Sequence, residues 1–254
     1  MRTAWPFSAL FLLSCAGAQK PAGSAPDPRV RAQAIVAAND RTPQDRAIDP
    51  GRRPVETLTF LRLEPGMHVA ELGAGGGYTT ELMARAVSPG GEVYAQNPEV
   101  FVSSFLKTIW PARLARPAMK NVVRVDREFD DPLPPEAKGL DLVLINVIYH
   151  DVSYMPVDRD KMNKAVFDAL RPGGAYVVVD SSARSGTGTS DAKTLHRIDE
   201  ELVRKEVLQA GFKLQEEGDF LRNPQDTRDW NSSPPAAGER RGTSDRFALR
   251  FVKP

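Results

Sequence analysis

Hydrophobic and polar residues form two alternating patterns along the chain after the turn at residues 65–66. Short apolar or β-branched runs predict strands at 68–72, 92–96, 121–125, 140–145, 175–179, 212–215 and 247–252. Between them, apolar residues at helical spacing predict helices at 79–87, 101–109, 160–170 and 191–210, and a further helix beginning near Pro54. Strands that alternate with helices indicate parallel βαβ units.

Two of the predicted strands, 140–145 and 175–179, are almost wholly apolar rather than alternating. That pattern is typical of strands covered by helices on both faces of a sheet. We therefore predict a doubly wound, three-layer α/β domain from about residue 50 to residue 254.

The first fifteen residues have the order of an export signal. A basic start is followed by an uncharged apolar stretch at 4–13, which is too short to cross about 30 Å of hydrocarbon. The sequence Leu12-Leu13-Ser14-Cys15 resembles the bacterial lipobox, whose cysteine becomes the lipidated N-terminus. We interpret residues 1–15 as a lipoprotein signal and expect lipidated Cys15 to anchor an exported protein to a membrane.

Other interpretations of the N-terminus remain open. Cleavage after Ala18 would release the protein without an anchor, the apolar start could be accidental, and a downstream translation start would leave the protein in the cytoplasm. Residues 16–49 are expected to form a flexible tether and N-terminal extension, because 16–28 is rich in Ala, Pro, Gly and Ser.

Composition narrows the possible partners. The formal net charge of +1 provides no broad field for nucleic acid, and we expect no nucleic-acid partner. The chain has one cysteine, so it can form neither an intramolecular disulfide nor a multi-cysteine metal site. We expect no metal ligands.

A glycine-rich segment follows the first predicted strand. Glu71 is followed by Gly73, Gly75 and Gly77, directly before a predicted helix. Glycines at this place let the backbone approach a ligand, and the start of a helix offers free amide groups. Tyr78 occupies the last glycine position of the dinucleotide fingerprint G-x-G-x-x-G, which disfavours a nicotinamide or flavin dehydrogenase.

An acid, a spacer and alternating glycines resemble motif I of class I S-adenosylmethionine (SAM)-dependent methyltransferases. Later segments resemble the same family in the same order, including Leu170-Arg171-Pro172-Gly173-Gly174 before the fifth strand. The resemblance extends to a group of predicted exported bacterial methyltransferases. It implies a mostly parallel seven-stranded sheet with an antiparallel last strand, and SAM as the cofactor. The implied cofactor-binding residues are Glu71, Gly73, Gly75, Gly77, Asn97, Asp126 and Asn146.

Within this resemblance, Glu71 lies at the ammonium group of SAM, Asn97 at the ribose and Asp126 at the adenine. The ribose position usually carries an acid in the family, so Asn97 is a departure. Asn146 ends the fourth strand, on the substrate side.

The catalytic chemistry requires a methyl acceptor and, where that acceptor is protonated, a base. His150 follows the fourth strand and is our candidate base, with Asp151 or Tyr149 to orient it. We interpret His196 as a residue of a helix surface, with a position in the pocket as the alternative. The expected acceptor is a small molecule.

Two other functions remain open. An exported domain of this fold could bind SAM or another ligand without turnover. An aminopropyltransferase would need an acidic pair near the fourth strand, and residues 146–149 contain no acid.

Overall fold

The structure is a computed structural model that describes Met1 and residues 27–254. The expected signal peptide, Cys15 and the start of the tether lie outside the described residues. Within the described residues, no helix combines the length and apolar character needed to cross a membrane.

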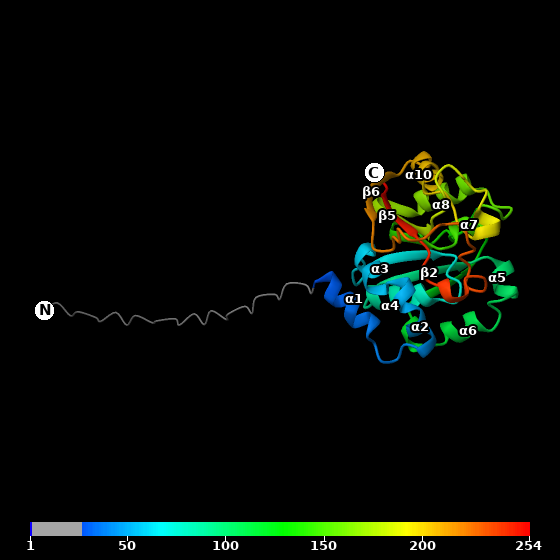
Figure 1. Cartoon of the computed structure of the whole chain (residues 1–254). Helices are drawn as coiled ribbons and strands as arrows, with labels where there is room; N and C mark the ends of the chain where they lie inside the picture. The colour runs from blue at the N-terminus through cyan, green and yellow to red at the C-terminus, as the bar shows by residue number, and fades with distance from the viewer. Residues whose placement is uncertain (2–26) are drawn as a thin grey trace.

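A seven-stranded sheet forms the centre of the fold, as predicted (Figure 1). Its order is β3-β2-β1-β4-β5-β7-β6, in which β1 to β5 pair in parallel and β7 pairs antiparallel with both β5 and β6. The strand order reverses at β1, so the ends of β1 and β4 form the switch point where α/β sheets bind ligands. The strands are β1 His68–Leu72, β2 Glu92–Asn97, β3 Val122–Asp126, β4 Leu140–Asn146, β5 Leu170–Ser181, β6 Lys213–Gly218 and β7 Arg246–Val252.

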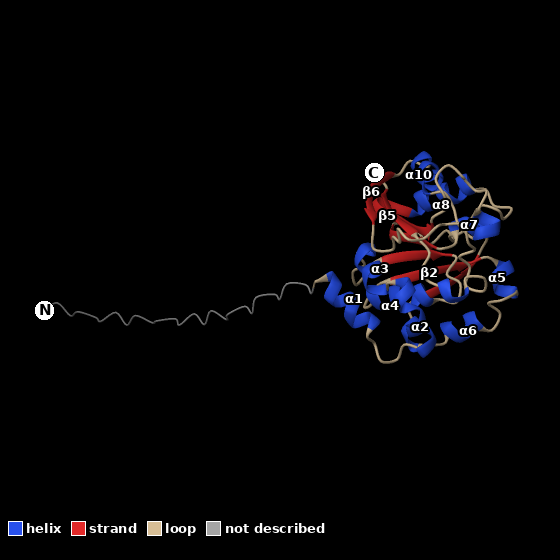
Figure 2. Ribbon diagram, in the orientation of Figure 1, coloured by secondary structure: helices blue, strands red, loops and turns tan. Residues whose placement is uncertain are grey.

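Helices cover both faces of the sheet (Figure 2). Apolar residues of α1, α3 and α4 pack with Val69, Leu144 and Val177 on one face. Apolar residues of α7, α8 and α10 pack with the strand positions that alternate with these, such as Leu72 and Val143, on the other. The α-helices are α1 Pro28–Val36, α2 Pro43–Arg52, α3 Pro54–Leu61, α4 Tyr78–Val87, α5 Glu99–Ser103, α6 Ile109–Leu114, α7 Tyr149–Val152, α8 Arg159–Ala169, α9 Ala192–Leu195 and α10 Glu200–Gln209, with 3-10 turns η1 Pro117–Met119 and η2 Gly238–Arg240.

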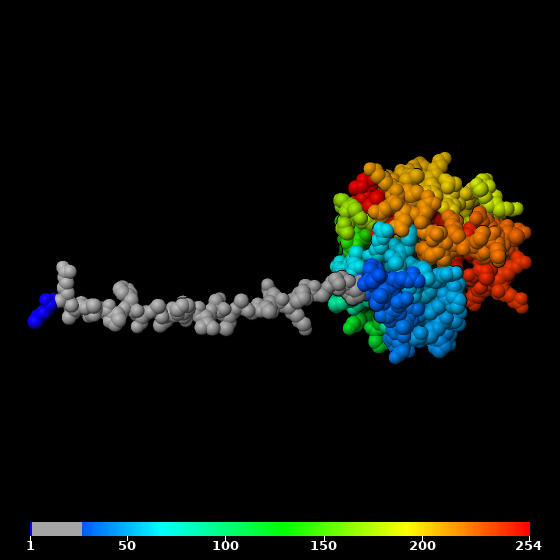
Figure 3. Space-filling view, turned by 60° about the vertical axis from the view of Figure 1, so that its left-hand side comes forward, coloured from blue at the N-terminus to red at the C-terminus, as the bar shows by residue number. Residues whose placement is uncertain are grey.

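The two N-terminal helices pack against the domain (Figure 3, blue). Partly buried ion pairs hold α2 in place: Asp49 pairs with Arg41 at 2.7 Å and accepts a hydrogen bond from the Tyr78 hydroxyl at 2.6 Å. Asp45 of the same helix pairs with Arg113 of α6 at 2.7 Å. The expected domain boundary at residue 50 falls inside α2, and α1 also packs against the domain.

Two predicted helices are divided in the structure. The predicted helix 191–210 consists of α9 and α10, because His196 adopts a left-handed conformation after α9 and Asp199 caps α10 by accepting a hydrogen bond from the Glu201 amide. The predicted helix 101–109 is replaced by α5 and α6. Pro111 lies in the first turn of α6, where its missing amide proton is tolerated, rather than ending a helix.

Candidate cofactor and acceptor site

The glycine loop after β1 adopts a conformation that favours glycine. Gly73, Gly75 and Gly77 have φ values of 63°, 55° and 78°. A Cβ atom at Gly73 would lie 2.8 Å from the Ile148 side chain, and one at Gly77 would lie 2.8 Å from Trp110. A Cβ atom at Gly75 would have the Gly73 carbonyl oxygen, an atom of the same loop, as its nearest neighbour at 4.0 Å. The loop is therefore packed at both ends and open at Gly75, where a ligand can reach the backbone.

Two amide side chains at the end of β2 hold this loop. The Gly73 amide donates to Gln96 Oε1 at 2.9 Å, and the Gly75 amide donates to Asn97 Oδ1 at 2.8 Å. Asn97 Nδ2 in turn donates to the Gly75 carbonyl at 3.3 Å. Both side chains are fully buried. Sequence reasoning missed Gln96, although an amide within a buried strand was a signal. Asn97 fixes Gly75 in this structure, and its contact with a ribose stays a prediction.

Glu71 lies beneath the loop rather than on an open surface. Its carboxylate accepts a hydrogen bond from the Thr80 hydroxyl and is buried. Burial raises the pKa of Glu71 to about 7, although Thr80, Thr79 and nearby Arg52 favour the charged form. Because an ammonium group would stabilise the carboxylate, cation binding should lower this pKa. The ammonium contact itself stays a prediction.

The remaining predicted cofactor residues lie at the same edge of the sheet. Asn146 ends β4 and donates from Nδ2 to the Thr79 hydroxyl of α4 at 3.1 Å. Asp126 ends β3, pairs in register with Asn97 of β2, and forms an ion pair with Arg124 at 2.6 Å. The structure thus brings the predicted residues to one edge, while their contacts with SAM stay predictions.

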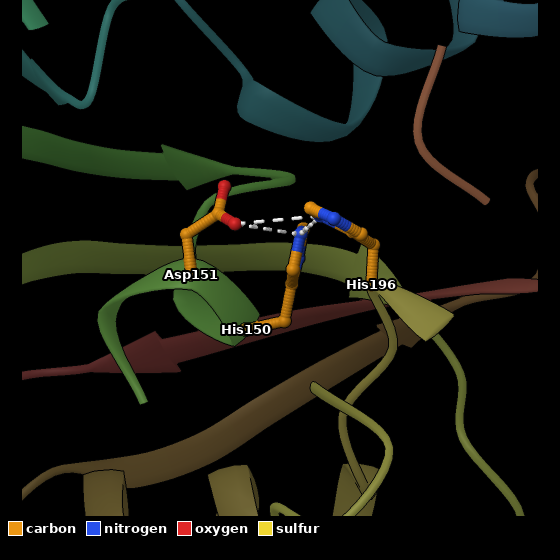
Figure 4. Close-up of side chains that lie close together, drawn as sticks. All are labelled: His150, Asp151 and His196. Carbon is orange, nitrogen blue, oxygen red and sulfur yellow. Dashed lines mark hydrogen bonds and ion pairs between the residues drawn. The ribbon is translucent and has the colours of Figure 1, made fainter. Parts of the chain in front are cut away.

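A cluster of two histidines and two aspartates lies at the carboxyl ends of β4 and β5. His150 lies in α7, and His196 follows α9; Figure 4 shows both rings and Asp151 converging. His150 Nε2 is 3.2 Å from His196 Nδ1 and 3.3 Å from Asp151 Oδ1. His150 Nδ1 is 2.7 Å from Asp180 Oδ1, at the end of β5. The helix-surface interpretation of His196 was wrong, because the helix ends at Leu195 and directs this ring into the cluster.

Asp180 is the functional candidate that sequence reasoning missed. It follows the apolar run of β5 at the carboxyl edge of the sheet, and that position was its only signal. Its carboxylate is fully buried and also accepts hydrogen bonds from the backbone amides of His150, at 2.8 Å, and Ser181, at 2.7 Å.

Tyr149 does not orient His150, contrary to our expectation. Its hydroxyl donates to Glu206 at 2.8 Å and accepts from Asn163 Nδ2 at 2.8 Å, and its side chain is fully buried in the core. Consecutive residues of a helix point about 100° apart, so Tyr149 and His150 face different sides of α7.

The two carboxylates next to His150 determine its protonation. Burial alone would lower the pKa of this imidazole, but Asp180 and Asp151 outweigh it and raise the pKa to about 10. A general base works best with a pKa near the operating pH. The arrangement therefore favours a protonated ring that donates hydrogen bonds, and the base role of His150 stays a prediction.

A cavity of about 280 Å³ lies beside the cluster, between α2, the ends of β4 and β5, and the segment before β7. Val147 and Ser181 line it on the sheet side. Its charged lining consists of Arg52, Arg241 and Arg246; among the described residues that line it there is no acid. Burial lowers the pKa of Arg52 and lowers that of Arg246 to about 10. The cavity is thus a positively charged recess.

Comparison with known proteins agrees with this geometry. Residues 53–105 match the family model of protein-L-isoaspartate (D-aspartate) O-methyltransferase, which covers the helix before β1, the glycine loop and β2. The fold is similar to a SAM-dependent methyltransferase from Aquifex aeolicus, with 16% identity, a TM-score of 0.57, and coverage of 82% of this chain and 96% of that one.

Two further solved structures have the same fold. The glycopeptide N-methyltransferase MtfA, in complex with S-adenosylhomocysteine, is 16% identical with a TM-score of 0.54, covering 85% of this chain and 100% of that one. The cyclase SpnF is also 16% identical with a TM-score of 0.54, covering 83% of this chain and 80% of that one. This chain therefore has the fold that these two methyltransferases and SpnF share. Because SpnF is a cyclase, the fold alone does not define the reaction.

Proposed function

We propose that this protein is a class I SAM-dependent methyltransferase. The observation that carries the proposal is the glycine loop at the switch point of the sheet. It is closed by side chains at Gly73 and Gly77 and open at Gly75, so a ligand can approach the backbone there. The partial family match includes this loop.

SAM supplies an activated methyl group, so the protein must mainly bind and orient the two reactants. The glycine loop holds the methionine part of the cofactor, and Glu71 beneath it balances the positive charge. The carboxyl edge of the sheet, where Asn146 and the His150 cluster lie, then faces the methyl group. His150 and its carboxylates position the acceptor there.

The acceptor in this proposal is a small anionic molecule that binds in the arginine-lined cavity. A volume of about 280 Å³ is suited to a small organic ligand, and guanidinium groups bind carboxylates or phosphates strongly. Arg52 supports the assignment, because no ion pair of its side chain occurs among the described residues, whereas Arg41 and Arg113 are paired with aspartates.

Two measurements on the purified full chain test the proposal. Calorimetry should show binding of SAM and of S-adenosylhomocysteine. Methyl transfer should then be measured with a panel of small carboxylates and phosphates, with matched neutral amides and amines as controls. Transfer to anionic acceptors is the expected result, and transfer only to amines would contradict the acceptor class. SAM binding without transfer to any acceptor would instead favour the non-catalytic binding protein.

We also propose that the protein is exported and anchored through lipidated Cys15. The support is the basic start, the apolar stretch and the lipobox-like Leu12-Leu13-Ser14-Cys15. Mass spectrometry of the native N-terminus tests this. A diacylated or triacylated Cys15 is expected, and an intact Met1 or a terminus after Ala18 would contradict it.

A further inference from the structure

Three potential ligand atoms converge where α7 meets the residue after α9. His150 Nε2, His196 Nδ1 and Asp151 Oδ1 lie within 4.8 Å of one another (Figure 4). The pairwise distances are 3.2 Å between the two ring nitrogens, 3.3 Å from His150 to Asp151 and 3.5 Å from His196 to Asp151. The three atoms therefore form a nearly equilateral triangle.

The size of this triangle fits a tetrahedral zinc ion. Zinc lies about 2.0–2.2 Å from nitrogen and oxygen ligands, which places the ligands of a tetrahedral site about 3.3–3.6 Å apart. Adjacent ligands of octahedral magnesium lie closer, about 2.8–3.0 Å apart, and magnesium prefers oxygen ligands. Two imidazoles with one carboxylate are a set that binds zinc without cysteine. We expected no metal ligands from the sequence, which has one cysteine. This set of ligands contains no cysteine, so the lack of further cysteines does not prevent zinc binding.

The surroundings of the triangle have the features that hold metal ligands in place. Metal-bound histidines commonly donate their second ring nitrogen to a carboxylate, which fixes the ring and its tautomer. For His150 this carboxylate is Asp180, whose Oδ1 lies 2.7 Å from His150 Nδ1. Two backbone amides donate hydrogen bonds to Asp180 and fix its carboxylate. The Tyr154 hydroxyl donates to Asp151, and the Ser232 hydroxyl donates to the His196 carbonyl at 2.7 Å.

The triangle is closed on one side and open on the other. The His150 side chain is 4% exposed, whereas those of His196 and Asp151 are 27% and 19% exposed. Ser232, which contacts His196, also lines the arginine cavity. An ion bound here would have three protein ligands and a fourth position for an added ligand, as catalytic zinc sites do.

We propose that His150, Asp151 and His196 bind a zinc ion, with Asp180 orienting His150. Zinc binding needs neither SAM nor an acceptor, so it can be tested even if the methyltransferase proposal fails. Where that proposal holds, the ion would bind the acceptor at its fourth position and lower the pKa of the acceptor group. The competing explanation for the close approach of these atoms is that no metal binds and that a proton on His150 Nε2 is shared in hydrogen bonds with His196 and Asp151.

Metal titration of the purified, chelator-treated full chain distinguishes the two explanations. We expect one tightly bound zinc ion per chain, and Co²⁺ in its place should give the strong visible absorption of a tetrahedral site. No zinc binding, or a weak octahedral Co²⁺ spectrum, would overturn the proposal.

Variants assign the ion to this cluster. His196→Ala should weaken zinc binding by about 100-fold or more, and Asp180→Asn by about 10–100-fold. His196 is the first choice because it is partly exposed, and circular dichroism should confirm that each variant folds. His68→Ala is the matched control, since His68 is exposed at the start of β1, and its affinity should stay within about twofold of wild type. Equal zinc affinity in His196→Ala and wild type would overturn the proposed site.

Discussion

The glycine loop and the histidine cluster lie at the same edge of the sheet but are built in different ways. The loop is a continuous stretch after β1, whose shape depends on backbone conformation and on the neutral amides of Gln96 and Asn97. The cluster joins side chains that are far apart in sequence, since His150 and His196 are 46 residues apart, and it depends on charge. The loop can thus be recognised from one short sequence motif, whereas the cluster can be recognised only from the tertiary fold.

This contrast predicts that a single added side chain disables the loop. Gly75→Val should reduce SAM binding by about 1000-fold, or about 4 kcal/mol. The valine would enter the open space at Gly75 and would also strain a residue with φ of 55°. Calorimetry measures the loss. Gly139→Val is the matched control, because Gly139 has φ of 68° and nothing within 4 Å of an added Cβ. Wild-type affinity in Gly75→Val would refute the assignment of the loop.

Removal of a cluster side chain should affect turnover rather than cofactor binding. We expect His150→Ala to lower kcat by about 300-fold, within the range for acid–base groups, with the Kd for SAM nearly unchanged. Steady-state kinetics with the identified acceptor, together with calorimetry, separates the two effects. His68→Ala should behave as wild type. If His150→Ala kept full activity, the cluster would have no part in the reaction.

The buried carboxyl beneath the loop gives a pH-dependent effect on stability. The pKa of Glu71 is raised from 4.5 to about 7, so the folded state binds more protons than the unfolded state between these values. Its contribution to stability is present below pH 4.5 and is lost as the pH rises through 7. Relative to Glu71→Gln, the wild type should therefore lose about 3 kcal/mol of unfolding free energy between pH 4 and pH 8.

Denaturant unfolding of both proteins at several pH values measures this difference. Glu99→Gln, which changes an exposed carboxyl at the start of α5, is the control and should differ from wild type by less than about 0.5 kcal/mol. A difference between wild type and Glu71→Gln that does not change with pH would show that Glu71 is not buried as described.

The smallest expected effect concerns the support of the loop. Asn97→Asp should weaken SAM binding by about tenfold, because a carboxylate cannot donate to the Gly75 carbonyl and would be fully buried. Asn231→Asp, which removes a donor to the Thr194 carbonyl on an exposed segment, should leave SAM binding unchanged. Tighter binding by Asn97→Asp would instead support the ribose contact expected from the sequence.

The sheet and most of its helices could be predicted from the sequence because they depend on local patterns, whereas the contacts of the glycine loop with a cofactor stay a prediction. Apolar strands and the glycines at 73, 75 and 77 carry their information within a few residues. The cluster was only partly foreseen: His150 and Asp151 follow β4 directly, but Asp180 and His196 join them only when β5 lies beside β4. Tyr149 was misassigned because its direction on a single helical turn depends on which side of α7 packs against the core.

A crystal structure of the full chain with SAM would show whether the glycine loop binds the cofactor. We expect the methionine part of SAM against the backbone at Gly75, with its methyl group directed toward Asn146 and the His150 cluster. SAM bound elsewhere on the protein, or a side chain filling the space at Gly75 at saturating SAM, would contradict this expectation.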